Sequence, residues 1–128
     1  MRAEALEIAD AYRDGRIKLL TPDLLWPESG NAFWKAVRQR RMLLADAEAA
    51  IRTLREMNIP AVPAIDLLDR AFSIATAFGH PVYDCIYIAL AACSRAPLIT
   101  ADENLAMRFS ARFPVRWLGS MEIAGCAT

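Results

Sequence analysis

The segment from His80 to Phe109, HPVYDCIYIALAACSRAPLITADENLAMRF, constrains the fold more than any other part of this sequence. Its first half predicts a largely apolar helix over Val82–Ser94, and an apolar strand over Pro97–Thr100 follows at once. Short apolar runs also lie between helical patterns elsewhere, at Ile17–Leu20, Ala61–Val62 and Val115–Leu118. Strands that alternate with helices predict an α/β fold, with a short, mostly parallel sheet flanked by helices.

Length and charge set the first bounds on organisation and function. The chain has 128 residues, which predicts a single domain over residues 1–128. Its 15 basic and 15 acidic residues give a formal net charge of zero. The whole molecule therefore has no field that would attract nucleic acid, and any such contact must come from a local basic patch.

The sequence predicts a cytoplasmic protein with no membrane segment. The longest uncharged apolar stretch, Cys85–Cys93, is far too short to span a bilayer, and the first residues do not form a signal peptide. The three cysteines form no C-x-x-C motif, and Cys85 and Cys93 are expected to be buried, reduced thiols. His80 is the one histidine, which argues against a zinc site.

Three acidic residues are candidates for a metal site at one edge of the predicted sheet. In an open parallel sheet, ligands bind outside the carboxyl ends of the strands. Glu28 lies in the first turns of the helix after Ile17–Leu20, and Asp102 lies two residues past the strand that ends at Thr100. Asp84 lies in the first turn of the helix that leads into that strand.

Carboxylates that share one crevice stay ionised at low cost only when a cation lies between them. Oxygen ligands without nitrogen or sulfur suit Mg²⁺ or Mn²⁺. Such an ion can generate hydroxide and stabilise the transition state of phosphate cleavage. Each residue also has a structural alternative. Asp102 can cap the helix that follows, Asp84 can complement a helix dipole, and Glu28 can be an ordinary solvated residue.

The sequence resembles a PIN domain, specifically the VapC-type ribonuclease toxins of bacterial toxin–antitoxin pairs. The matching stretches are LLTPDLLWPESGNAFWKAV at Leu19–Val37, HPVYDCIYIALAACSRAPLITADENLA at His80–Ala106, and VRWLG near the end. The resemblance implies a three-layer PIN-like fold and an endoribonuclease. It places the catalytic metal ligands at Glu28, Asp84 and Asp102, which would hold one or two Mg²⁺ or Mn²⁺ ions for RNA cleavage.

The sequence departs from the resembled family at its start. Family members open with a strand that ends in an aspartate, commonly Val-Asp-Ala-Ser, before the equivalent of Ala3. We expect that strand and its metal ligand to be missing from this domain. The remaining two or three carboxylates would then hold a metal ion less well than four would. The alternative function is therefore a non-catalytic PIN-like module that acts in protein binding or assembly.

Two basic pairs are candidates for RNA binding. Lys35 and Arg38 belong to a basic cluster at a helix end, and Arg108 and Arg112 lie one turn apart after Asp102. They could hold RNA phosphates beside the carboxylates. Cations near a helix C-terminus can equally be dipole complements.

An aromatic helix pair is a candidate partner surface, with ordinary core packing as the alternative. Its residues are Leu25, Trp26, Phe33, Trp34, Leu43 and Leu44. By the resemblance, this region would bind the apolar segment of a cognate antitoxin, with tryptophans as anchors. The hydrophobic fraction of 55% and the missing strand together predict that the protein is a homodimer.

Overall fold

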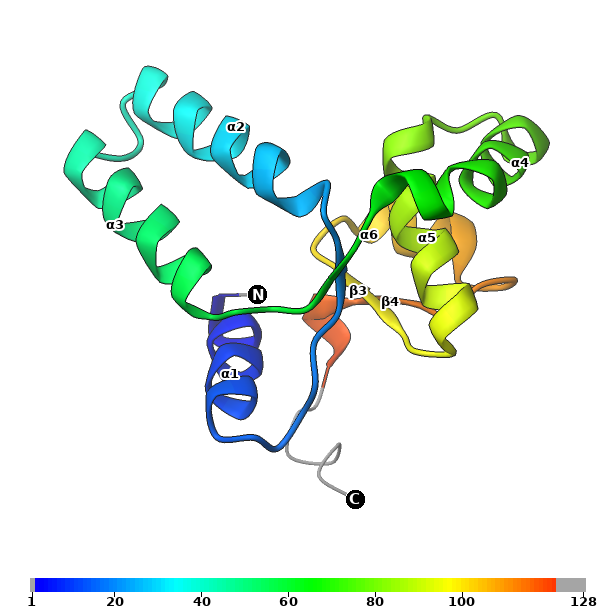
Figure 1. The fold of residues 1–128 in the computed structure, drawn as a ribbon, viewed down its shortest axis with the longest axis horizontal. Helices are drawn as coiled ribbons and strands as arrows, with labels where there is room; N and C mark the ends of the chain where they lie inside the picture. The colour runs from blue at the N-terminus through cyan, green and yellow to red at the C-terminus, as the bar shows by residue number, and fades with distance from the viewer. Residues whose placement is uncertain (1, 122–128) are drawn as a thin grey trace. The chain divides into compact units, whose positions relative to one another are not determined.

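Residues 2–121 are described by the computed structural model, shown as a ribbon in Figure 1. The chain divides into two units. One consists of Leu20–Ala64, and the other combines Met1–Leu19 with Ile65–Thr128. We call them the hairpin unit and the main unit, and we describe each by itself. The α/β class is confirmed, because helices alternate with short parallel strands.

The hairpin unit contains two helices between two short strands. Its elements are β1 (Thr21–Pro22), α2 (Leu25–Arg38), α3 (Leu44–Glu56) and β2 (Ala61–Val62). The strands are parallel, with Thr21 opposite Ala61. The two helices run back along each other as a hairpin (Figure 1). The Asp23 carboxylate accepts a 2.9 Å hydrogen bond from the Ala64 N–H, which ties together the two ends of this unit.

The predicted strand at Ile17–Leu20 is wrong by a few residues. The strand instead forms at Thr21–Pro22, because this segment makes hydrogen bonds with the segment around β2. The Thr21 N–H donates to the Pro60 carbonyl, and the Asp23 N–H donates to the Val62 carbonyl. Pro22 fits between them because it has no N–H to pair. The next helix then starts at Leu25, with Pro27 in its first turn, where a missing N–H is tolerated.

The main unit carries most of the helices and the second parallel pair. Its elements are α1 (Arg2–Arg13), the 3₁₀-helix η1 (Ala64–Leu67) at the junction of the two units, α4 (Leu68–Phe78), α5 (Val82–Ser94), β3 (Leu98–Thr100), α6 (Glu103–Phe109), β4 (Val115–Trp117) and the 3₁₀-helix η2 (Leu118–Ser120). Leu98 pairs with Val115, Ile99 with Arg116 and Thr100 with Trp117. Helices α4 and α5 pack against each other (Figure 1).

The core of the main unit is built on α5 and on Phe109. Helix α5 is apolar nearly all round, which is typical of a buried helix, and Cys85, Ile88 and Ala89 on it are completely buried. Phe109 is also completely buried, and its ring lies 5.3 Å from that of Phe78. Gly79 ends α4 in the left-handed conformation, with φ at 60°, and this turn carries the chain into α5.

No single helix within residues 2–121 is both long and apolar enough to cross a membrane. One sharply bent pair, Ala64–Phe78 with Val82–Ser94, meets the length and composition criteria together across a bend of 116°.

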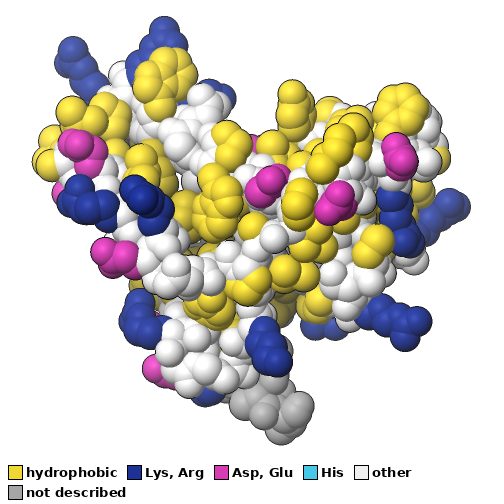
Figure 2. Space-filling model, viewed as in Figure 1, with side chains coloured by type: hydrophobic (Ala, Val, Ile, Leu, Met, Phe, Trp, Pro, Cys, Tyr) yellow, Lys and Arg dark blue, Asp and Glu magenta, His cyan; other side chains and the backbone are white. Residues whose placement is uncertain are grey.

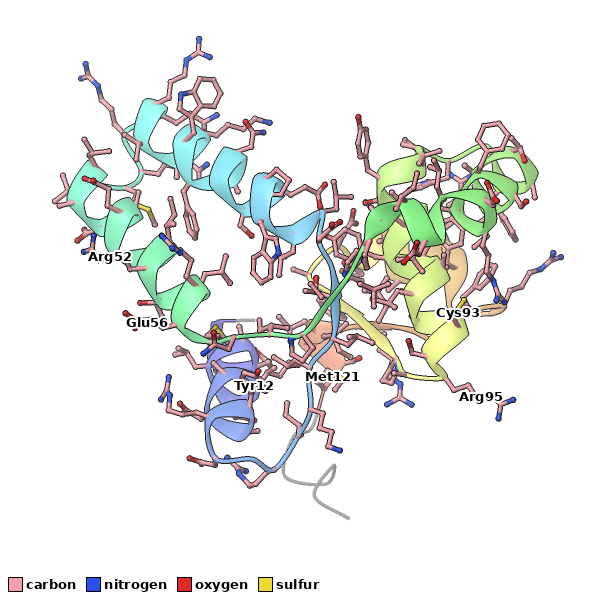
Figure 3. The ribbon with its side chains drawn as sticks, in the orientation of Figure 1. Tyr12, Arg52, Glu56, Cys93, Arg95 and Met121 are labelled. Atoms are coloured by element: carbon pink, nitrogen blue, oxygen red, sulfur yellow. The ribbon has the colours of Figure 1, made fainter. Side chains whose placement is uncertain are left out.

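The two cysteines of α5 differ in exposure, which corrects the prediction that both are buried. Cys85 is completely buried, whereas Cys93 lies in the exposed last turn of the helix, where it is labelled in Figure 3. Burial raises the pKa of the Cys85 thiol, with the neighbouring Asp84 carboxylate as a second cause. The thiolate is the reactive form of cysteine, so Cys85 lacks both access and reactivity.

We therefore expect iodoacetamide at pH 8 to alkylate Cys93 in the folded protein and to spare Cys85. Fragment-ion mass spectrometry of the peptide that contains both residues would measure this. The same reaction in urea is the control, since both thiols should then react. Equal labelling of the two thiols in the native protein would contradict the packing of α5.

Candidate functional site

Asp84 lies in the first turn of α5 and is paired with a histidine from the turn before the helix. The His80 Nε2 atom lies 2.8 Å from Asp84 Oδ2. The His80 side chain is only 15% exposed, whereas that of Asp84 is 46% exposed. The carboxylate is therefore held on its protein side and open on its solvent side. The predicted first-turn position of Asp84 is confirmed.

His80 has a second polar neighbour on its other ring nitrogen. Arg108 Nη1, from the last turn of α6, lies 3.4 Å from His80 Nδ1. The Arg108 Nη2 atom donates to the Phe78 carbonyl at the end of α4. The His80 ring stands edge-on to Phe109, with 5.1 Å between the ring centroids. The histidine that pairs with Asp84 lies in the turn between α4 and α5, and it is itself contacted by residues of α6, one of which also bonds to the end of α4.

Asp102 follows β3 and caps α6. Its Oδ1 atom accepts a 3.1 Å hydrogen bond from the Leu105 N–H, which is the expected geometry of an N-cap. The Thr100 hydroxyl accepts from the Asp102 N–H at 3.0 Å, which fixes the backbone at the exit of the strand. The capping role proposed as an alternative is therefore confirmed. It leaves Oδ2 at an exposed position, so capping and metal binding are compatible.

The donor chemistry of the two aspartates fits a hard divalent cation. Among the described residues, Asp84 uses Oδ2 for its hydrogen bond and Asp102 uses Oδ1. Each carboxylate thus keeps one oxygen for another ligand. Mg²⁺ typically retains several waters and is bound through one or two carboxylates together with the phosphates of its substrate.

The described part of the chain does not assemble a larger metal cluster. Within residues 2–121, no three histidine, cysteine, aspartate or glutamate side chains are grouped so that they could hold one ion. Glu28 lies on the exposed surface of α2 in the hairpin unit, whereas Asp84 and Asp102 belong to the main unit. The convergence of all three remains a prediction.

The basic residues also separate between the two units. Lys35 and Arg38 lie in the last turns of α2, where the Arg38 guanidinium stacks over Trp34 at 5.3 Å. In the main unit, the guanidinium of Arg112 stacks over Phe78 at 5.5 Å, and Arg108 is the residue that contacts His80. RNA binding by these four residues remains a prediction.

The hairpin unit exposes apolar side chains in the predicted partner region. A groove of ≈ 650 Å³ runs between α2 and α3, with Trp26, Gly30, Ile51, Leu54 and Ile59 among its lining residues. Four of the six predicted partner residues are exposed, namely Trp26 (36%), Trp34 (54%), Leu43 (72%) and Leu44 (63%). Figure 2 shows hydrophobic and basic side chains together on this part of the surface.

Comparison with known proteins identifies the family. The family model of the PIN domain matches residues 2–108. This chain therefore belongs to the PIN-domain family. It is homologous to VapC ribonucleases: ribonuclease VapC9 of Mycobacterium tuberculosis is 28% identical over 98 residues, which cover 77% of this chain and 76% of that protein. Ribonuclease VapC3 of Pyrobaculum aerophilum is 32% identical over 96 residues, which cover 73% of each chain.

His80 is the site residue that sequence reasoning missed. It was considered only as a zinc ligand, and a single histidine argued against that role. The signal that could have revealed it is the spacing of four residues to Asp84, with Pro81 between them as the helix N-cap. Residues four apart lie on one face of a helix, so a histidine just before the first turn can reach an aspartate within it.

Proposed function

We propose that this protein is an endoribonuclease toxin that uses a divalent metal ion to cleave RNA phosphodiester bonds and is neutralised by a cognate antitoxin. The observation that carries the proposal is its membership of the PIN-domain family. The segment matched by the family model, residues 2–108, contains all three candidate ligands, Glu28, Asp84 and Asp102. The relatives named as VapC ribonucleases support RNA as the substrate.

Asp84 and Asp102 would hold one or two Mg²⁺ or Mn²⁺ ions through their open oxygens, with Glu28 as a further ligand. A bound divalent ion supplies a water of lowered pKa and neutralises charge on the phosphate. The contribution of the chain would be to present these carboxylates at fixed positions. The Leu105 N–H and the His80 ring hold them.

RNA cleavage in the presence and absence of a chelator tests this function. We expect the protein to cut a synthetic single-stranded RNA in Mg²⁺ or Mn²⁺, to lose this activity in EDTA, and to regain it when excess Mn²⁺ is added. Cleavage that persists in EDTA would contradict metal dependence.

Lys35 and Arg38 are proposed to hold RNA phosphates. Replacing both with alanine should weaken RNA binding and lower the dependence of affinity on salt. Each lost phosphate contact to a single strand should reduce the slope of log affinity against log salt by about 0.7, or about 1.4 for both. Fluorescence anisotropy in a salt series with the Asp84→Asn background, which prevents cleavage, would measure this.

The matched control for that experiment is the Arg52→Ala/Lys18→Ala variant, which removes the same charge elsewhere. Arg52 lies on the outer face of α3 beside Glu56, as labelled in Figure 3, and Lys18 is exposed. We expect the control variant to keep the original slope. An equal change in both variants would mean that the effect follows net charge and that no phosphate site exists at the end of α2.

The partner surface is proposed to lie on the hairpin unit. The six residues Leu25, Trp26, Phe33, Trp34, Leu43 and Leu44 would anchor an apolar antitoxin segment, and the exposure of both tryptophans supports this role. A homodimer is proposed on separate grounds. Helix α4 exposes Phe72 (59%), and the 3₁₀-helix η1 before it exposes Ile65 (73%); a second subunit would cover both.

A second candidate function is a non-catalytic PIN-like module that acts in protein binding. The observation that favours it is the lack of a three-residue metal cluster within residues 2–121. This module would bind its partner through the hairpin unit and would show no metal-dependent cleavage. The chelator experiment separates the two candidates.

A further inference from the structure

The ring of His80 is fixed on three sides inside the main unit. Nε2 lies 2.8 Å from Asp84 Oδ2, and Nδ1 lies 3.4 Å from Arg108 Nη1. The ring edge meets Phe109 at an interplanar angle of 85°. Its backbone is held as well, because the His80 N–H donates to the Ala75 carbonyl at 3.1 Å. A ring with these contacts has one orientation.

The contacts favour one assignment of the proton on the ring. A guanidinium has only donors, so a hydrogen bond from Arg108 requires Nδ1 to be the acceptor. In the neutral ring the proton then resides on Nε2, which donates to the Asp84 carboxylate. The chain of hydrogen bonds runs in one direction, from Arg108 to His80 to Asp84.

Arg108 has two further contacts within the main unit. Its Nη2 atom donates to the Phe78 carbonyl, and its guanidinium lies 5.7 Å from the centre of the Phe109 ring. Phe78 and His80 flank Gly79, so one guanidinium spans both sides of the turn between α4 and α5. The orientation of Asp84 is thus tied to the packing of α6 on the end of α4.

We propose that His80 is a positioning residue for Asp84. By donating to Oδ2, it fixes the carboxylate so that Oδ1 remains available to a divalent cation, and Arg108 fixes the ring tautomer that makes this donation possible. The inference rests on the proposed function, because it assigns His80 a role toward the metal ligand. Hydrogen-bond partners of ligating carboxylates typically contribute 10- to 100-fold in metal affinity or activity.

The first test needs no metal, because His80 is the single histidine of the chain. A protein labelled with ¹⁵N-histidine gives a long-range ¹H–¹⁵N spectrum from this ring alone. At pH 8 we expect the tautomer with the proton on Nε2. Arg108→Ala should produce a mixture of tautomers, whereas Arg70→Ala, which removes an exposed arginine from α4, should leave the spectrum unchanged. A proton on Nδ1 in the wild-type protein would overturn the proposal.

The second test measures Mn²⁺ affinity by electron paramagnetic resonance. We expect His80→Ala to weaken Mn²⁺ binding by about 10- to 100-fold. His80→Gln should recover most of the loss, since its amide N–H can still donate to Asp84. In an Asp84→Asn background, His80→Ala should weaken binding no further, because its effect passes through that carboxylate. If His80 served only to stabilise the fold, the losses of Mn²⁺ affinity from His80→Ala and Asp84→Asn would be additive.

The outcomes distinguish this inference from the function on which it rests. If the wild-type protein neither binds Mn²⁺ nor cleaves RNA, the proposed function fails and the positioning role fails with it. If the wild-type protein binds Mn²⁺ and His80→Ala binds it equally well, the positioning role alone is wrong. If His80→Ala lowers the thermal midpoint strongly, the Mn²⁺ affinity of His80→Gln and the tautomer in the wild-type ¹H–¹⁵N spectrum test the positioning role instead.

Discussion

Replacing Asp84 with asparagine is expected to reduce metal-dependent RNA cleavage by about 100- to 1,000-fold. Asparagine keeps the shape of the side chain and removes the charge that would hold the proposed cation. A bound metal ion contributes several kcal/mol of charge stabilisation in the transition state, and each 1.36 kcal/mol is a factor of ten in rate. Asp102→Asn should have an effect of similar size, because the second carboxylate is lost.

Controls must separate loss of metal from loss of fold. Asp66→Asn removes an exposed carboxylate from η1 in the same chain, and it should keep the wild-type rate. The thermal midpoint of Asp84→Asn should change little, because the amide can still accept a hydrogen bond from His80 through its oxygen. Purifying the wild-type and variant proteins in parallel excludes a contaminating nuclease. Full activity in Asp84→Asn would refute the assignment of this residue as a ligand.

Phe109→Ala should destabilise the protein by about 3–5 kcal/mol, the usual range for a buried phenylalanine. Phe109 is completely buried, and its ring contacts those of Phe78, Phe113 and His80. Truncation leaves a cavity that the surrounding helices can fill only in part. A loss of this size is a large fraction of the free energy of unfolding of a typical domain. Urea unfolding followed by tryptophan fluorescence would measure it.

Phe72→Ala is the matched control for this stability measurement. Phe72 is the same residue type on α4 of the same unit, but its side chain is 59% exposed. Exposed substitutions usually change the free energy of unfolding by no more than about 0.5 kcal/mol. Urea midpoints that shift equally for both variants would contradict the core position of Phe109. Because the Phe109 ring contacts the ring of His80, Phe109→Ala should also weaken metal binding.

Local sequence signals were sufficient for much of the main unit. The bounds of α5 were predicted as Val82–Ser94 and are observed there, because a largely apolar segment follows Pro81. Gly79 ends the preceding helix as expected for a residue that adopts positive φ. Asp102 begins α6 through a cap that its position after the strand indicated.

Pairing between distant segments could not be predicted in the same way. The position of β1 depends on hydrogen bonds to Pro60 and Val62, which lie about 40 residues further along the chain. Nothing within Ile17–Leu20 indicates that the pairing is displaced. The His80–Asp84–Arg108 chain was missed for a related reason, since Arg108 reaches His80 only when α6 packs against the end of α4. The relation of Glu28 to the two aspartates is likewise a question of tertiary arrangement.

Metal-directed cleavage of the polypeptide tests most directly whether these carboxylates form one site. Fe²⁺ binds oxygen-rich sites that accept Mg²⁺ or Mn²⁺, and with ascorbate and peroxide it generates radicals that cut the backbone nearby. We predict cuts clustered beside Glu28, Asp84 and Asp102, suppressed by excess Mn²⁺ and absent from the Asp84→Asn/Asp102→Asn variant. Cuts at other positions, or a pattern unchanged in that variant, would contradict a metal site at these residues.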